Sequence, residues 1–178
     1  MTNFIRTTSL AATVAFLAAA ATPALAVTGP TPVSPDKQAK ATATIVKPLT
    51  MTWVRDLNLG TIVLSGASPF AGAVVGINQA GTFTCTDANV TCSGPTSNAQ
   101  YTLTGTDDQV VTVNTLPTLT LTNQADNTKT LTMNVDAPAN VNLGSSGTTA
   151  LPVGGSISVD STTADGVYQG TFAVTVNY

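Results

Sequence analysis

The chain has 178 residues, of which six are Lys or Arg and nine are acidic, so its net charge is −3. An acidic chain with so few cations lacks the basic surface that binding to nucleic acids or anionic lipids requires. It contains no His and no Glu, so the commonest general base is missing and nine Asp residues supply all the side-chain carboxylates. We therefore expect a protein that is not an enzyme and that holds no metal or cofactor.

The remaining composition favours strands over helices. Charged residues make up 8% of the chain, far below the roughly 25% of ordinary soluble domains. Twenty-nine threonines follow residue 26, and β-branched side chains suit a pleated surface. The residues that usually cover helix surfaces, Glu, Lys, Gln and Arg, are scarce. The sequence predicts an all-β protein whose solvent face carries hydroxyl and amide groups.

The N-terminus has the features of a secretory signal. Arg6 precedes an uncharged apolar run over residues 10–21, and small residues stand at positions 24 and 26. This pattern predicts a signal peptide over residues 1–26. The run is shorter than the roughly 20 residues that cross a bilayer, so we expect no membrane span in the mature chain. Residues 27–38 contain three prolines and are predicted to form a flexible leader.

A single domain is predicted over residues 39–178. Its first segment, 39–46, carries small or apolar side chains at every second position: Ala39, Ala41, Ala43 and Ile45. A period of two predicts a strand with one buried face. In chain order, strand patterns follow over 49–53, 57–64, 70–77, 80–86, 101–104, 111–114, 118–122, 130–135, 141–143, 157–159 and 172–178. Short strands separated by short turns predict an antiparallel β-sandwich or barrel.

The mature chain contains two cysteines, Cys85 and Cys92, with six residues between them. An even pair in an exported protein predicts a disulfide. A metal site would require more ligands than the sequence offers. The aromatic residues are few and scattered: Trp53, Phe70, Phe83, Tyr101, Tyr168, Phe172 and Tyr178. Most alternate with polar residues, which favours a place in the core over an exposed sugar-binding face.

Two segments resemble a known class of pilins. Residues 166–178 contain a Gly-Val-Tyr element and end in Val-Thr-Val-Asn-Tyr. This ending resembles the C-terminal strand of archaic (alternative) chaperone–usher pilins and of the related spore coat protein U domain. Residues 56–62, Asp-Leu-Asn-Leu-Gly-Thr-Ile, resemble an early Leu-Asn-Phe-Gly strand of the same proteins. Together with residues 41–50, they also resemble a pilin-like family of Gram-negative secreted domains of unknown function.

The resemblance implies an immunoglobulin-like sandwich that lacks one strand. A periplasmic chaperone fills the open groove first, and the N-terminal strand of the next subunit fills it during assembly at an outer-membrane usher. Here the donor face would be Ala39, Ala41, Ala43 and Ile45. The C-terminal residues that would line the groove are Phe172, Val174, Val176 and Tyr178. The expected function is a structural subunit of a cell-surface pilus, built from copies of itself or sister pilins and serving adhesion or biofilm formation.

Another interpretation also fits the sequence. Residues 39–46 fit equally well as the first strand of a complete, self-contained sandwich. The chain would then be a monomeric secreted or surface-attached binding module of immunoglobulin-like fold, an adhesin or a glycan binder.

Overall fold

The computed structural model describes residues 33–34, 36–65, 69–70 and 72–178. The chain divides into two units, residues 1–42 and residues 43–178. In the first unit, the described residues are exposed and form no helix or strand. The predicted signal peptide, 1–26, lies outside the described residues, as do residues 27–32 and 35 of the predicted leader.

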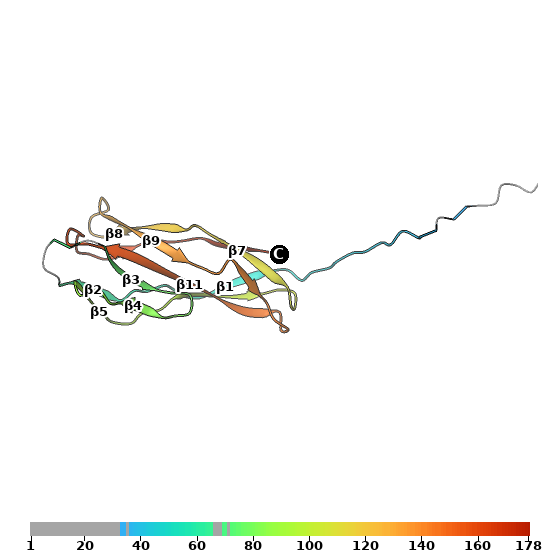
Figure 1. The fold of residues 1–178 in the computed structure, drawn as a ribbon, viewed down its shortest axis with the longest axis horizontal. Coiled ribbons are helices and arrows are strands. Elements are labelled where there is room, and N and C mark those ends of the chain that lie inside the picture. Colours follow the sequence, from blue (N-terminus) through green and yellow to red (C-terminus); the bar gives the residue numbers. More distant parts are fainter. Residues whose placement is uncertain (1–32, 35, 66–68, 71) are drawn as a thin grey trace, which may run out of the picture. The chain divides into compact units, whose positions relative to one another are not determined.

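The second unit is built from strands (Figure 1). Its described residues form thirteen of them: β1 (Thr50–Arg55), β2 (Thr61–Leu64), β3 (Ala73–Ile77), β4 (Phe83–Cys85), β5 (Val90–Ser93), β6 (Ala99–Thr104), β7 (Val110–Thr115), β8 (Thr118–Asn123), β9 (Thr130–Asp136), β10 (Asn140–Asn142), β11 (Thr148–Val159), β12 (Tyr168–Gln169) and β13 (Val174–Asn177). No helix long and apolar enough to cross a membrane occurs among the described residues.

The strands form three antiparallel sheets. The largest runs in the order β1-β6-β11-β9-β8-β12, with β3 on β11 and β4 on β3. A three-stranded sheet has the order β10-β7-β13, and β2 pairs with β5. Every pairing within these sheets is antiparallel. The prediction of an all-β, antiparallel architecture is therefore confirmed.

The long strand β11 curls the large sheet because it changes neighbours along its length. Residues 148–153 pair with β6, whereas the residues from Gly155 onward pair with β3. On its other edge, β9 pairs only from Gly154 to Ile157. Pro152 lies before that stretch, where its missing N–H costs no bond to β9. A side chain at Gly154 would collide with the backbone of Ile77 and Asn78, so glycine is required where the neighbours change.

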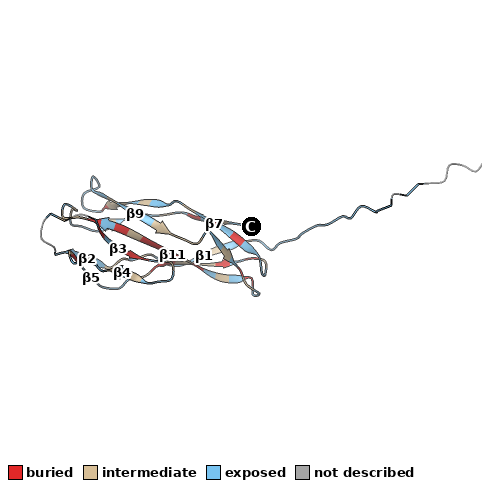
Figure 2. Cartoon of the chain, viewed as in Figure 1, coloured by how far each residue is buried: buried red, intermediate tan, exposed pale blue. Residues whose placement is uncertain are grey.

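Two apolar clusters form the core (Figure 2). The first lies between the β6–β11 part of the large sheet and β7 and β13: Ala99, Leu103, Val111, Val113, Leu143, Leu151, Val153 and Val174. The second lies under β3, β9 and the end of β11: Ala73, Val75, Val90, Met133, Ile157 and Val159. Because alternate residues of a strand face one side of a sheet, the period of two in the sequence correctly identifies core positions such as Leu103, Val111, Val113, Met133 and Val174.

Two sequence predictions differ from the structure. Residues 39–46 form no strand and are exposed throughout, with Ile45 91% exposed. Three alanines bury little area, and no strand in the described part of the chain pairs with them. The core position expected for Trp53 and Tyr178 is also wrong, since these side chains are 59% and 45% exposed. Trp53 lies on the edge strand β1, and Tyr178 is the last residue.

Candidate functional site

An open, largely apolar groove of about 1260 Å³ lies between two stretches that are far apart in sequence. Residues 56–64 form one side, which we call the N-terminal wall, and residues 163–172 form the other, the C-terminal wall. The floor consists of side chains from β8, β9 and β11: Leu119, Leu121, Leu131, Met133, Ile157 and Val159. The groove therefore exposes one face of the large sheet between the first and last parts of the folded chain.

The floor is a regular apolar surface set by strand register. Leu119 lies opposite Met133, and Met133 lies opposite Ile157, so these three side chains form a row across β8, β9 and β11. Leu121 lies opposite Leu131 in the next row. Residues directly opposite one another share a face of the sheet. Met133 and Ile157 are buried, whereas the three leucines are only half-buried, so the groove leaves apolar surface uncovered on β8 and β9.

The N-terminal wall is held by a backbone exchange. Asn58 and Ser97 donate their N–H groups to each other's carbonyl oxygens, at 2.7 and 2.9 Å. The side-chain oxygen of Asn58 then accepts the N–H of Gly60 at 2.8 Å. Gly60 has φ +74°, and an added Cβ would lie 2.5 Å from the carbonyl oxygen of Ser93. Both the left-handed conformation and the close approach require glycine. The Leu-Asn-Leu-Gly element thus turns the chain into β2.

A disulfide fastens this wall to the rest of the domain. Cys85 in β4 is bonded to Cys92 in β5, with 6.3 Å between their Cα atoms. The prediction of this disulfide is confirmed. Strand β4 belongs to the large sheet, whereas β5 pairs with β2 in the N-terminal wall. The bond therefore joins the two-stranded sheet covalently to the sheet that forms the floor.

The C-terminal wall is anchored by a buried asparagine. The amide of Asn123 donates to the carbonyl oxygen of Asp165 at 2.8 Å, and its oxygen accepts the N–H of Ala125 at 2.9 Å. Gly166 packs so closely on Asn123 that a side chain there would overlap the amide. The hydroxyl of Tyr168 donates to the carbonyl oxygen of Ala164 at 2.9 Å. These contacts explain why a Gly-x-Tyr element stands at this corner.

The edges of the two walls are unpaired. Among the described residues, β2 is bonded only to β5 and β12 only to β8. Residues 170–173, between β12 and β13, form no strand. An open sheet edge presents free N–H and C=O groups that can template another strand. The groove therefore combines an apolar floor with backbone groups suited to strand addition.

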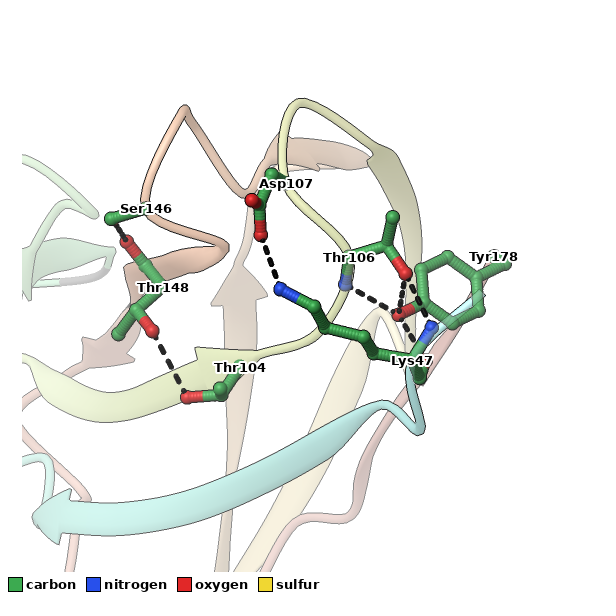
Figure 3. Close-up of polar contacts among 7 residues, drawn as sticks. All are labelled: Lys47, Thr104, Thr106, Asp107, Ser146, Thr148 and Tyr178. Carbon is green, nitrogen blue, oxygen red and sulfur yellow. Dashed lines mark hydrogen bonds and ion pairs between the residues drawn. The ribbon is translucent and has the colours of Figure 1, made fainter. Parts of the chain in front are cut away.

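A second feature, which we call the exit clasp, lies where residues 39–46 leave the folded unit. It consists of Lys47, Thr106, Asp107 and Tyr178 (Figure 3). The Tyr178 hydroxyl donates to the carbonyl oxygen of Lys47 at 2.7 Å and accepts the N–H of Thr106 at 2.9 Å. The N–H of Lys47 donates to the Thr106 hydroxyl at 2.6 Å. Both backbone groups of Lys47 are thus fixed by the rest of the domain.

The electrostatics of the clasp are those of an exposed surface. The Lys47 ammonium lies 2.8 Å from the Asp107 carboxylate. The hydrogen bond from Lys47, followed by the attraction of its charge, lowers the pKa of Asp107. The carboxylates of Asp126 and Asp160 also have lowered pKa values, mainly because they accept hydrogen bonds from Thr128 and Thr162. None of these carboxylates lines the groove, where the charged side chains are Asp56 and Asp165.

The residues singled out from the sequence fall in different places. All four predicted donor residues are exposed and lie outside any strand: Ala39, Ala41, Ala43 and Ile45. Of the four C-terminal residues, Phe172 lines the groove and Tyr178 belongs to the clasp. Val174 belongs to the first core cluster, and the partly buried Val176 packs against that cluster. The sequence analysis missed the clasp, although the aromatic C-terminal residue, Tyr178, was an available signal for it. It also did not identify the leucines of β8 and β9 as the floor of a groove.

The sequence of the folded unit matches the model of a protein family. The model of a family described as a domain of unknown function (DUF4402) matches residues 49–178. No curated protein matches the chain. The matched region starts two residues after Lys47 and includes both walls and the floor of the groove.

Proposed function

The chain belongs to the DUF4402 family, and we propose that it is a structural subunit of an extracellular filament in which residues 39–46 of one copy fill the groove of another. The observation that carries this proposal is the groove itself, with its apolar floor between two unpaired strand edges. An open edge of this kind is an aggregation hazard unless it is covered. A strand from a second copy would cover the leucines and pair with the edge in one step.

In this proposal, the domain is an immunoglobulin-like sandwich that lacks one strand. The bond from Tyr168 to the carbonyl of Ala164 is similar to the tyrosine corner of such sandwiches. The early Leu-Asn-Leu-Gly element and the Gly-Val-Tyr element resemble those of archaic chaperone–usher pilins, and here they shape the two walls. The groove supports the same interpretation, because it lies between the first and last parts of the folded chain.

The donor segment meets the requirements for strand addition. Residues 39–46 are exposed and form no strand, so no intramolecular pairing has to be broken before they bind elsewhere. Their alternating pattern places Ala39, Ala41, Ala43 and Ile45 on one face, toward the floor of an accepting groove. Burial of an isoleucine side chain contributes about 1.5–3 kcal/mol, and ladder hydrogen bonds add to it. Ile45 is therefore the anchor of the segment, and the alanines let the backbone approach the floor.

The proposal also assigns a route and a location. The chain is exported, crosses the periplasm with its groove held by a chaperone, and is assembled through an outer-membrane usher onto the cell surface. Copies joined head to tail by a non-closing contact form a filament. The disulfide suits an oxidising compartment, and adhesion or biofilm formation is the expected role of the polymer.

The deciding experiment uses the chain from residue 47 to 178 and a synthetic peptide of residues 36–46. We expect the peptide to bind and, at a concentration of about 100 times its Kd, to raise the melting temperature by about 10 °C. The control peptide carries Ile45→Asp and should leave the melting temperature unchanged. Absence of binding by the unaltered peptide would contradict the proposal.

A matched pair of variants locates the binding to the groove. Leu121→Arg places a charge on the floor, whereas Leu116→Arg changes an exposed leucine outside the groove. We expect the first variant to lose peptide binding and filament formation, and the second to retain both. Equal binding by the two variants would place the peptide elsewhere and refute the assignment.

One observation favours a second candidate, a monomeric glycan-binding module. The Trp53 side chain is 59% exposed, with its indole N–H held by Asp56 at 3.0 Å. An exposed, oriented aromatic ring offers an apolar surface to a ligand. If this candidate is correct, the chain binds glycans on an array, and Trp53→Ala abolishes that binding. A silent array would remove it.

A further inference from the structure

The turn between β4 and β5 carries an acceptor pattern for a covalent modification. Asn89, Val90 and Thr91 form an Asn-x-Thr sequon, which is the pattern at which exported proteins receive N-linked glycans. It is the only Asn-x-Ser/Thr pattern in the sequence, although the chain contains twelve asparagines. Because threonine is so abundant here, the place of the pattern in the fold must decide whether it can be used.

The sequon lies on the surface and is held in place by its middle residue. Asn89 is half-buried and belongs to a turn that the N–H of Val90 closes by donating to the carbonyl oxygen of Asp87 at 3.3 Å. The side chain of Val90 is 6% exposed and belongs to the second core cluster. Successive residues of a strand point to opposite faces, and Thr91 is exposed. Val90 therefore anchors the turn to the core, while the Thr91 hydroxyl stays on the outside.

The amide group of Asn89 is oriented by a carboxylate of its own turn. Its Nδ2 atom donates to Oδ1 of Asp87 at 2.9 Å, and the same oxygen accepts the backbone N–H of Asn89 at 2.8 Å. An amide nitrogen carries two hydrogens, and among the described residues Asp87 alone accepts one of them. A sugar can replace the other hydrogen while the bond to Asp87 remains. Glycosylation at this position therefore removes no contact that holds the domain together.

Two buried asparagines show the opposite situation. Asn98 and Asn123 are 4% and 2% exposed, and their amides donate to the carbonyl oxygens of Gln79 and Asp165. A glycan on either side chain would force these packed segments apart. Neither residue is followed by Ser or Thr two positions later. The position that has the acceptor pattern is thus one that can hold a glycan, whereas these two buried asparagines have neither property.

We propose that Asn89 is a site of N-linked glycosylation, modified after export by an oligosaccharyltransferase that uses a lipid pyrophosphate-linked oligosaccharide. The Nδ2 atom forms a bond to the anomeric carbon of the first sugar and gives up one proton to the enzyme. The bond between that carbon and the pyrophosphate oxygen breaks, and the lipid pyrophosphate leaves. This inference goes beyond the proposed function, because it requires export of the chain but no filament.

The register of the two-stranded sheet indicates what the glycan would cover. Val63 of β2 lies opposite Thr91 of β5, so the two side chains share a face of this sheet. Val63 is 50% exposed. A sugar chain on the neighbouring Asn89 would shield this apolar side chain from other proteins, on a surface that has few charges to keep it soluble.

The test is mass spectrometry of the chain purified from the envelope of the cells that produce it. We expect the proteolytic fragment that contains Asn89 to carry the added mass of a sugar chain. Asn89→Gln and Thr91→Ala should each abolish this added mass. Two controls should retain it: Thr91→Ser, which keeps the hydroxyl, and Asn127→Gln, which changes an exposed asparagine outside the sequon. Detection of the Cys85–Cys92 disulfide in every variant shows that the domain has folded.

Two results would overturn the inference. One is an unmodified Asn89 in the chain from its own cells. The other is a sugar mass that persists in Asn89→Gln and is released by alkaline β-elimination, because the sugar would then be attached to a threonine or serine oxygen. Failure of the proposed function is distinct, since the chain of residues 47–178 would then not bind the peptide of residues 36–46, whatever the state of Asn89.

Discussion

The hydroxyl of Tyr178, the last residue, donates a hydrogen bond to the carbonyl oxygen of Lys47 across 131 positions of the sequence. This bond brings together the start of the folded unit and its end. The same hydroxyl accepts the N–H of Thr106 from the loop between β6 and β7. Three distant parts of the chain thus meet at one phenol group. In a filament joined through residues 39–46, tension on the donor segment would reach the domain at this contact.

Removal of that hydroxyl tests how much the clasp stabilises the fold. Tyr178→Phe deletes the bonds of this hydroxyl to Lys47 and Thr106 and keeps the ring. We therefore expect a loss of about 1 kcal/mol in the free energy of unfolding, the usual net value for a hydrogen bond. Tyr101→Phe is the matched control, because no hydrogen bond from the Tyr101 hydroxyl occurs among the described residues. Urea unfolding of the chain from residue 47 to 178 measures both variants. Equal stability of the two would contradict a structural role for the clasp.

The ion pair of the clasp gives a pH prediction. The pKa of Asp107 is lowered from its ordinary value of 3.8 by Lys47, so the unfolded state binds more protons at acid pH than the folded state does. The contribution of the pair is therefore complete above about pH 4 and is lost as the pH falls through the folded pKa. NMR titration of the Asp107 carboxyl should show the lowered value, and Lys47→Met should return it toward 3.8. A pKa that does not change in Lys47→Met would refute this assignment.

The disulfide should stabilise the domain by closing a short loop. Cys85 and Cys92 are seven positions apart, and the loop-entropy relation gives about 2.5 kcal/mol for such a loop. We expect Cys85→Ser with Cys92→Ser to lower the free energy of unfolding by about this amount. We also expect faster hydrogen exchange in β2 and β5, because the bond joins this pair to β4. If exchange instead increased equally in β13, the bond would not act on the N-terminal wall.

Much of the fold could be predicted from the sequence because the strands facing the two core clusters alternate regularly. The hydroxyl-rich strands β8 and β9 follow directly from that period. The strand β11 could be predicted only over its last residues. Pro152, Gly154 and Gly155 would predict the end of a strand. In the structure they lie within the continuous strand β11, at the place where it exchanges one neighbouring strand for another. That exchange depends on tertiary packing, which local patterns do not encode.

The candidate site was less accessible to sequence reasoning. The pattern correctly shows that Leu119, Leu121 and Leu131 share a face with core residues, but it cannot show that this face stays partly uncovered. The apolar period of residues 39–46 predicts a strand, although none of the described strands pairs with this segment. A strand needs a neighbour as well as a pattern. The groove and the clasp both arise from contacts between residues far apart in sequence, so local sequence patterns do not predict them.

The close approach at Gly60 gives the last prediction, on the shape of the N-terminal wall. Gly60→Ala should lower both stability and affinity for the peptide of residues 36–46, because the new methyl group would meet the Ser93 carbonyl oxygen. Gly81→Ala is the matched control: Gly81 has φ +82°, but nothing lies within 4 Å of an added Cβ. Both variants incur the conformational cost of about 1–2 kcal/mol for a left-handed residue, and only Gly60→Ala adds a collision.

Urea unfolding and peptide titration together separate these two effects. The loss of stability should be larger in Gly60→Ala than in Gly81→Ala, and the loss of peptide affinity should occur in Gly60→Ala alone. The reason is position, since residues 56–64 line the groove and Gly81 lies in the hairpin between β3 and β4. If Gly60→Ala bound the peptide as tightly as the unaltered chain, the wall that Gly60 shapes would not form part of the acceptor site.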